Sequence, residues 1–485
     1  MEIAFIDYSL ANDLISPLDF ILFESDNSVA DLYNKYFARG GIEKFCRPRF
    51  IKNIELNGGK IMSERTYLIP KFGPLSGIRV ISFGSLAAMP FAGTLMADYG
   101  AEVIHLERPE VGDQFRIIGP FSTNDGKRIG NNQVQMARNR LSMEMEVNLN
   151  IPESREVFFD LIRQSDIFME NMVWLDKFGI KDEELLAVNP KLVIAHVSGY
   201  GNVNFGGLAE YTNRAAYDLI GQAYSGFLFL NGQAPPEGPS PANPYTNDFF
   251  SALFCLVGVL VAYIEAQKSG KGQSVDVAQF EAMAACLADT WVSWTSSDVL
   301  RERVGGTKVP STQPYGCYQD KNGDWVAICA FGNVYERFMK TAGLDSTYFK
   351  FEEVAQTPAG VSSPKGQELD KAITDWASAR TADEIADILA KVKVPCSRVH
   401  NAKTALEDPH WISRGDWVKY EDQSIKKEVT AFGIVPKFSR TPGQIWRGAP
   451  SLGQDTKDVL TKILKYSPEK IQALRDKKLV GDTAL

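Results

Sequence analysis

The chain has 485 residues, of which 44% are hydrophobic and 23% charged, a composition typical of a globular protein with two or three domains. Its net charge of −8 and the absence of a basic block argue against nucleic acid or a membrane surface as the main partner. The six Cys lack paired spacing and the four His lack an HExxH pattern, so we expect reduced thiols, a cytoplasmic location and no metal site.

Residues 1–61 differ in character from the rest of the chain. Seven acidic residues and no Lys or Arg precede Lys35, which excludes the basic first segment of a signal peptide. This segment could be an acidic accessory region or an appendage without a role. However, MSERTYLIP, from Met62, reads like a natural N-terminus, and residues 57–61 could be encoded by a ribosome-binding site. We therefore expect the native protein to start at Met62, with 1–61 as an N-terminal extension.

Alternating strand and helix patterns follow. We expect strands at 78–84, 101–107, 167–171 and 191–201, and helices from Pro90, at 152–165, at 182–188 and near 215–226. This βαβ order predicts a doubly wound α/β domain with a parallel sheet. The first turn, GSLAAMPFAG, lacks GxGxxG, which disfavours NAD binding. Glu107 could bind a ribose, and Arg108 either binds a sugar phosphate or is an ordinary surface residue.

Asp248 stands before an apolar run, 249–264, in which Ser251 is the only clearly polar residue. Asp is a favoured N-cap, so we expect Asp248 to cap this helix and to be ionised. Sixteen apolar residues are fewer than the ~20 that a membrane span needs, so we expect a buried core helix. An isolated Asp in this position usually only caps its helix.

The later chain has a different pattern. A strand (SVDVA) and a long helix at 278–297, with Trp291 and Trp294 in the core, are expected in a linker segment, 271–304, after the large domain, 62–270. A hairpin at 315–330 and helices near 333–342, 367–379 and 382–392 predict a smaller α+β domain, 305–402. The tail, 403–485, has a helix near 455–465 and should pack on the large domain.

The chemistry that remains after elimination is that of a carboxylate. GxSxG and P-loop motifs are absent, which argues against Ser-His-Asp hydrolysis and P-loop nucleotide chemistry. A carboxylate can act as a covalent nucleophile when it is ionised, desolvated and close to hydrogen-bond donors. Asp248 is the candidate, and the backbone of AFGN, 330–333, could supply donors.

Several motifs together resemble the family III coenzyme A-transferases, the group of formyl-CoA and carnitine CoA-transferases. They span 68 to about 465 and include PKFGPLSGIRV, YGAEVIHLERP, PKLVIAHVSGYG, YDLIGQAYSG, YTNDFFSAL, SGKGQSVDVAQFEAM and PGQIWRGAPSLGQDT. The resemblance implies a large Rossmann-like domain, a small domain and an interlocked homodimer. It implies that Asp248 attacks an acyl-CoA to form a mixed anhydride and then an aspartyl-CoA thioester, which a carboxylic acid reverses. CoA is then a substrate, and neither a metal nor a permanently bound cofactor is implied.

The resemblance also assigns site residues. It implies contacts to CoA from Arg108, Arg140, Asn171, Met172 and Lys177, and a substrate pocket formed by Tyr217, Asp218, Phe249 and Gly332. The chain departs from the family pattern at several positions. Lys177 stands where Arg is common, AFGN has fewer glycines than the family loop, and Ala87 replaces a residue that is polar in some members.

The substrate is expected to be a 2-hydroxyacid, such as 2-hydroxyisocaproate or phenyllactate in anaerobic fermentation, because ENMVWLDKFGI and ARNRLS resemble that branch of the family. Carnitine is the alternative, since Phe249, Phe250, Tyr211 and Tyr217 could hold a branched or aromatic side chain or surround a quaternary ammonium. Two alternative hypotheses place the protein in other functional classes. They are a Rossmann-type oxidoreductase and a non-catalytic CoA-binding protein in which Asp248 is only a cap.

Overall fold

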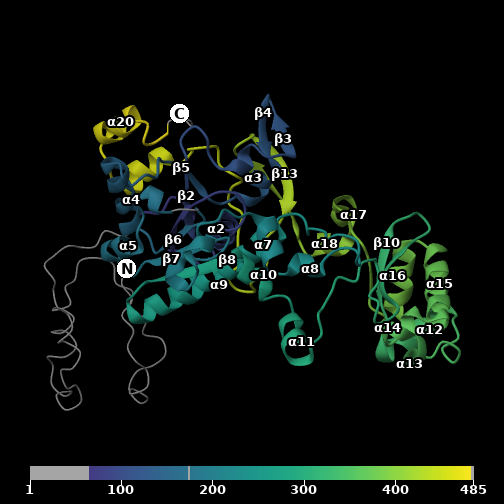
Figure 1. Cartoon of the computed structure of the whole chain (residues 1–485). Coiled ribbons are helices and arrows are strands. Elements are labelled where there is room, and N and C mark those ends of the chain that lie inside the picture. Colours follow the sequence, from purple (N-terminus) through teal and green to yellow (C-terminus); the bar gives the residue numbers. More distant parts are fainter. Residues whose placement is uncertain (1–64, 173–174, 482–485) are drawn as a thin grey trace, which may run out of the picture. The chain divides into compact units, whose positions relative to one another are not determined.

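The computed structural model describes residues 65–172 and 175–481. The expected extension, 1–61, and the expected start at Met62 lie outside these residues. The main feature is a six-stranded parallel sheet in the order β5-β2-β1-β6-β7-β8 (Figure 1). Its strands are β1 (Arg79–Phe83), β2 (Glu102–Glu107), β5 (Leu141–Glu144), β6 (Ile167–Glu170), β7 (Val193–Ser198) and β8 (Gln273–Ala278). The prediction of an α/β fold with a parallel sheet is confirmed.

The sheet is covered on both faces because its central strands are apolar on both sides. Adjacent residues of β1, such as Val80 and Ile81, point to opposite faces of the sheet and belong to different core clusters. One face carries α2 (Pro90–Asp98) and α9 (Thr246–Ser269). The opposite face carries α4 (Pro152–Arg163), α5 (Asp182–Val188) and C-terminal elements. Smaller elements of this part are β3 (Phe121–Asn124), β4 (Lys127–Gly130), α3 (Asn131–Met136), α6 (Ala209–Thr212), α7 (Asp218–Tyr224) and α8 (Phe227–Leu230).

Helix α9 has 24 residues and begins at Thr246. The expectation that the run is too short for a membrane span is therefore wrong, since α9 is the one helix among the described residues that is long and apolar enough to cross one. Its buried face, however, includes Asp248, Ser251 and Cys255 and packs on β7, β8 and α2 (Figure 1). That packing is typical of a helix covering a sheet.

The segment after α9 differs from the sequence prediction in two ways. Strand β8 pairs with β7 in parallel, so residues 273–278 belong to the large sheet and not to a linker. The long helix expected at 278–297 is divided into α10 (Gln279–Ala284) and α11 (Thr290–Ser297), and between them Ala288 has a left-handed φ of 50°. Trp291 and Trp294 on α11 are 51% and 55% exposed, so they are not core residues of this chain.

The smaller α+β part has its own core. Its antiparallel sheet has the order β11-β10-β9, from β9 (Tyr315–Gln319), β10 (Trp325–Cys329) and β11 (Cys396–Arg398). Tyr318, Phe338 and Ile373 are buried together in this core. The helices are α12 (Tyr335–Ala342), α13 (Phe351–Val354), α14 (Pro358–Ser362), α15 (Pro364–Ser378) and α16 (Ala382–Lys391).

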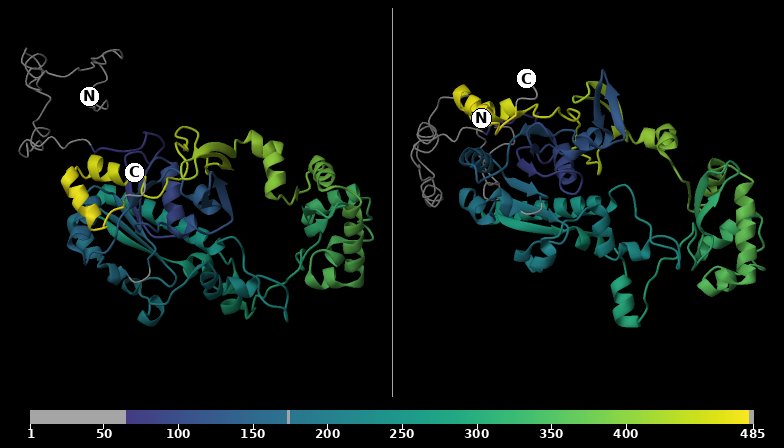
Figure 2. Two further views of the ribbon diagram at one scale, coloured as in Figure 1. Left: turned by 90° about the horizontal axis from the view of Figure 1, so that it is seen from above. Right: turned by 45° about the horizontal axis from the view of Figure 1, so that its top comes forward.

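The C-terminal segment returns to the large sheet (Figure 2). After α17 (Ala402–Glu407) and α18 (Pro409–Ser413), it forms a hairpin of β12 (Trp417–Asp422) and β13 (Lys427–Phe432). The Tyr420 hydroxyl donates to the Val134 carbonyl at 3.1 Å. Leu460 and Leu474, from the final elements, lie in the same core as Leu141. These elements are α19 (Thr456–Asp458), the π-helical turn Val459–Ile463 and α20 (Pro468–Asp476).

Candidate active site

Asp248 lies in the first turn of α9, two residues after the start of the helix. The expectation that it is the N-cap is wrong, because Tyr245 occupies that position with a left-handed φ of 45° and has no side-chain cap. The capping oxygen comes from another helix. Asp218 Oδ1, at the start of α7, accepts hydrogen bonds from the backbone N–H groups of Asn247 at 2.7 Å and Asp248 at 3.1 Å. The side chain of Asp248 is thereby left free for other contacts.

The carboxyl group of Asp248 is buried, with the residue only 7% exposed. Its Oδ1 accepts a hydrogen bond from Gln279 Nε2 at 2.6 Å. Burial, together with the nearby charge of Asp218, raises the pKa of Asp248 to about 7, and the bond from Gln279 opposes this rise. The expected full ionisation is therefore wrong near neutral pH. The ionised fraction is a desolvated and basic carboxylate, which suits a nucleophile.

The first turn of α9 packs closely on α7. Asn247 is fully buried, and its side-chain amide has no hydrogen-bond partner within the described part of the chain. A Cβ added to Gly221 of α7 would lie 1.9 Å from Asn247 Nδ2. Gly221 has no left-handed backbone, so the glycine is required here by space alone. The two helices can thus approach closely enough for Asp218 to reach the start of α9.

An apolar wall adjoins Asp248. Phe249 is half-buried and makes an edge-to-face contact with Phe91, with ring centroids 5.0 Å apart. It packs against a small cluster of Ala87, Phe115 and Met136. The apolar side chains of this cluster remove water from one side of the site, which favours the chemistry of a reactive acyl group.

The other residues of the expected substrate pocket lie in different surroundings. Tyr217 precedes Asp218 at the start of α7 and is 66% exposed. Gly332 lies in the smaller α+β part, in the turn Gly332–Val334, and is exposed with a φ of 57°. The structure thus brings Asp218 and Phe249 to Asp248, while the proposed role of Gly332 remains a prediction.

The residues expected at CoA follow the carboxyl ends of two strands. Arg108 comes after β2 and is exposed, and Asn171 and Met172 come after β6. Lys177 is exposed in the turn Leu175–Phe178. Because strands β2 and β6 both pair with β1, these positions share one edge of the sheet, where ligands of open α/β sheets bind.

Asn171 has a clear structural task. Its Oδ1 accepts from the backbone N–H of Ser85, and its Nδ2 donates to the Ser85 carbonyl, both at 3.0 Å. These two bonds fix the turn between β1 and α2. The backbone N–H of Met172 donates to Glu170 Oε2 at 2.6 Å, which fixes the turn after β6.

Two polar residues are less available than the sequence suggested. Arg140 is buried, with its guanidinium 3.4 Å from the Pro90 carbonyl, so it does not present its charge at the surface. Glu107 is buried and receives two hydrogen bonds of 2.7 Å from Arg116. Although burial opposes ionisation, Arg116 holds the pKa of Glu107 well below its usual value. Glu107 is therefore engaged inside the protein, and the suggestion that it binds a ribose is wrong.

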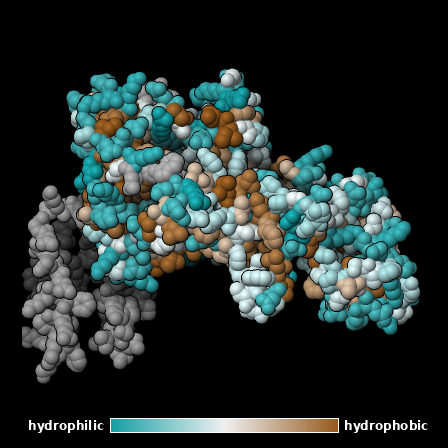
Figure 3. Space-filling model, viewed as in Figure 1, coloured by the Kyte–Doolittle hydropathy of each residue, from teal (hydrophilic) through white to brown (hydrophobic). Residues whose placement is uncertain are grey.

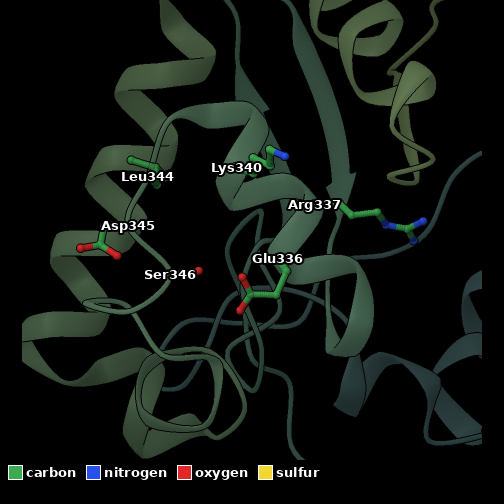
Figure 4. Close-up of a pocket in the computed structure, with 6 residues that line it drawn as sticks. All are labelled: Glu336, Arg337, Lys340, Leu344, Asp345 and Ser346. Atoms are coloured by element: carbon green, nitrogen blue, oxygen red, sulfur yellow. The ribbon is translucent and has the colours of Figure 1, made fainter.

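Two surface hollows lie in the smaller α+β part, and neither is lined by Asp248. One hollow of about 460 Å³ lies in the smaller α+β part and is lined by Glu336, Arg337, Lys340, Leu344, Asp345 and Ser346 (Figure 4). Its side chains carry both signs of charge, and none of them is an expected site residue. A second, of about 520 Å³, includes Gly332 in its lining. Among the described residues, no group of three His, Cys, Asp or Glu is placed to hold a metal ion.

The comparisons with known proteins define the class. Residues 75–456 match the family model described as CoA-transferase family III, and the chain therefore belongs to this family and is a CoA-transferase. It is 34% identical over 409 residues to the bile acid CoA-transferase BaiK of Clostridium scindens, covering 83% of this chain and 88% of that protein.

Two solved structures share the fold. A CAIB/BAIF family protein from Brucella suis is 26% identical, with a TM-score of 0.67, covering 81% of this chain and 100% of that chain. Rv3272 from Mycobacterium tuberculosis is 20% identical, with a TM-score of 0.65, covering 80% and 99%. The second likeness concerns the fold alone.

Sequence reasoning missed Gln279, the residue whose side chain contacts Asp248. Gln279 directly follows β8 and is the first residue of α10. The sequence feature that could have identified Gln279 is its position directly after the strand SVDVA, at the carboxyl edge of a parallel sheet. That signal places a polar side chain near the site without showing which residue it meets.

Proposed function

We propose that this enzyme transfers CoA from an acyl-CoA to a free carboxylic acid, with Asp248 as the covalent nucleophile. The observation that carries this proposal is the buried Asp248 carboxylate, which among the described residues accepts a side-chain hydrogen bond from Gln279 alone. A structural cap would direct its oxygens to the backbone N–H groups of its own helix, a task that Asp218 performs here. Asp248 is thus held in place without being used as a cap.

The proposed reaction conserves the energy of the thioester. A carboxylate oxygen of Asp248 attacks the thioester carbon, the C–S bond breaks, and CoA leaves as a thiolate. The thiolate then attacks Cγ of Asp248 and releases the first acid as a carboxylate, leaving an aspartyl-CoA thioester. The second acid attacks the same Cγ and expels the thiolate, which finally attacks the new acyl carbon and restores the carboxylate. The apolar wall around Phe249 limits hydrolysis of these intermediates.

Recognition of CoA is assigned to the edge formed by β2 and β6. Arg108 and Lys177 are exposed cations near this edge and suit the phosphates of the nucleotide. Asn171 and Met172 would line the adenine site, with Asn171 also holding the turn at Ser85. Arg140 is buried beside the start of α2 and would act on CoA through the β1–α2 turn.

The acceptor proposed for the second half-reaction is a 2-hydroxyacid. Phe249 offers an apolar wall next to Asp248, which suits the branched or aromatic side chain of such an acid. The segments around Lys177 and Arg140 support the same branch of the family. Likeness to BaiK adds a bile acid to the substrates that must be tested.

Carnitine is a second candidate because aromatic rings gather near α7. Tyr200, Tyr211, Tyr224 and Phe280 make ring contacts with centroid separations of 5.0 to 6.4 Å. Such rings can bind a quaternary ammonium. Against this, the guanidinium of Arg214 already lies 3.9 Å from the centre of the Tyr211 ring. The hydroxyacid is therefore the preferred substrate.

We also propose a homodimer, interlocked as the family resemblance implies. The outer face of α9 exposes Leu253, Phe254, Val257, Val261 and Ile264, with exposures between 41% and 63%. Hydrophobic side chains gather over the region of α9 to α11 (Figure 3). Patches of this kind mark interaction surfaces. Light scattering should give twice the monomer mass, and Val261→Glu should shift the protein towards monomer; a wild-type monomer would contradict the dimer.

The exchange reaction tests the proposed function. The enzyme should move CoA from an acyl-CoA donor to members of a panel of 2-hydroxyacids, carnitine and a bile acid, with the fastest rate for a 2-hydroxyacid. Asp248→Asn should abolish transfer and still bind CoA. Binding of CoA without exchange by the wild-type enzyme would favour a non-catalytic CoA-binding protein, and turnover of NAD(P)H would favour an oxidoreductase. Fractionation of the source cells should place the protein in the cytoplasm.

A further inference from the structure

Gln279 is the polar side chain that meets the reactive carboxylate. Its Nε2 lies 2.6 Å from Asp248 Oδ1, and both residues are buried. The chain reaches this point because β8 runs parallel to β7 and ends at the carboxyl edge of the sheet, where α9 begins. Since α10 starts directly after β8, the side chain of Gln279 is supported by a strand and a helix. A donor fixed in this manner needs little reorganisation during a reaction.

The hydrogen bond makes the two oxygens of Asp248 different. Oδ1 accepts a hydrogen bond from the side-chain amide of Gln279, whereas no described residue donates a hydrogen bond to Oδ2. Oδ2 is therefore the oxygen available for attack on an acyl carbon. After that attack, Oδ1 is the carbonyl oxygen of the anhydride and then of the aspartyl-CoA thioester.

We infer that Gln279 is a catalytic residue, the amide that stabilises negative charge on Oδ1 whenever Cγ of Asp248 becomes tetrahedral. The inference rests on the proposed function of Asp248. Charge develops on Oδ1 twice in each cycle, when the CoA thiolate attacks Cγ and when the incoming carboxylate attacks Cγ. In each case the N–H bond of Gln279 remains intact, and charge returns from Oδ1 to the leaving carboxylate or thiolate.

The chemistry of an amide suits this task. A neutral amide stabilises an oxyanion without giving up its proton, so it does not protonate the CoA thiolate. It also favours the ionised form of Asp248 before attack, which agrees with the direction in which Gln279 shifts the pKa of that residue. Methionine resembles glutamine in size and lacks the donor, so Gln279→Met isolates the hydrogen bond.

The test compares the wild type with Gln279→Met in the exchange assay and by rapid acid quench with intact-protein mass spectrometry. We expect kcat to fall by about 10²-fold, as for other oxyanion donors, with the KM for acyl-CoA nearly unchanged. In the first turnover, before the second acid is added, the adduct on Asp248 should shift from the CoA thioester towards the acyl anhydride, because the thiolate attack on Cγ that converts the anhydride into the thioester is slowed. The acid limb of the pH–rate profile should move to higher pH. Gln279→Glu, which replaces the donor with an acceptor, should be at least as impaired at neutral pH.

Gln367→Met, in the exposed face of α15, is the matched control and should retain wild-type rates. A variant that loses activity only through misfolding would show a lower folded fraction, with an unchanged adduct ratio and an unchanged pH profile. That result, or wild-type kcat in Gln279→Met, would overturn the role of Gln279. Absence of any Asp248 adduct in the wild type would instead overturn the proposed function itself.

Discussion

Asp218 Oδ1 accepts a hydrogen bond from the backbone N–H of Asp248, so one carboxylate holds the helix that carries the other. The same oxygen receives the N–H of Asn247, and Oδ2 receives Gln222 Nε2. Asp218 therefore has two effects on Asp248. It fixes the position of the nucleophile. Burial raises the pKa of Asp248 to about 7, and the negative charge of Asp218 contributes to that rise.

The pH dependence of transfer should report this pair. Because the ionised form of Asp248 attacks, kcat/KM should rise with pH through a midpoint near 7. Asp218→Asn removes the charge and keeps an oxygen that can cap α9, so the midpoint should fall. Asp218→Ala should also lose about 1 kcal/mol of stability with the cap. An unchanged midpoint in Asp218→Asn would show that the charge of Asp218 does not raise the pKa of Asp248.

The stability of Asp248→Asn should depend on pH relative to the wild type. Asp248 titrates near 7 in the folded protein and near 3.8 when unfolded, so the native state binds more protons between these values. Wild-type stability contributed by this group therefore falls as pH rises from about 4 to about 7. The free-energy advantage of Asp248→Asn should grow over that window to a few kcal/mol, measured by urea unfolding. A constant difference would contradict the raised pKa.

Gly221 should be intolerant of substitution. In Gly221→Ala, the new Cβ would lie 1.9 Å from Asn247 Nδ2, so α7 or the first turn of α9 must move. We expect a loss of about 1–3 kcal/mol in the free energy of unfolding and a fall in kcat. Gly238→Ala is the control, because a Cβ there meets no atom within 4 Å. Equal stability and activity in the two variants would show that α7 can move away from Asn247 at little cost, and would contradict the requirement for glycine at position 221.

His196 should be important for stability at neutral pH. It is buried between Glu170, at 2.7 Å, and Asp182, at 3.0 Å. Burial opposes its charge, but the two carboxylates raise its pKa to about 10, so its contribution is full below about 6.5 and is lost as pH rises through about 10.

His196→Leu leaves a buried carboxylate without its cation, and we expect a loss of about 3–5 kcal/mol at pH 7. Exposed His410→Leu should change stability by less than about 0.5 kcal/mol. Denaturant titrations of both variants check this. A loss in His196→Leu no larger than that in His410→Leu would contradict a charged His196.

The sheet was predictable because its strands are short apolar runs separated by helical patterns, as around 78–107 and 191–201. The left-handed residue Ala288 was not, since Ala carries no signal for that conformation and the helix pattern continues across it. Trp291 and Trp294 were expected in the core but are exposed in this chain. An apolar stripe on a helix does not indicate whether the surface that covers it belongs to the same chain.

The site was partly predictable for a similar reason. Asp248 stood out before a long apolar run. However, an Asp near the start of a helix can either cap the helix with its own side chain or have its backbone N–H capped by another side chain. The choice depends on Asp218, thirty positions away in sequence. The contact with Gln279 is likewise tertiary, and no local pattern specifies it. The pKa of Asp248 is raised by burial and by the charge of Asp218, against the opposing hydrogen bond from Gln279, and none of these three influences is visible in its own segment.

The most direct test of the central claim is to trap the activated carboxyl group of Asp248. The enzyme would be incubated with acyl-CoA, treated with hydroxylamine and digested, and the modified residue would be located by mass spectrometry. The proposed mechanism predicts a hydroxamate on Asp248 that depends on acyl-CoA and is absent without it. Turnover with an unmodified Asp248, or with a modification at another residue, would contradict covalent catalysis by Asp248.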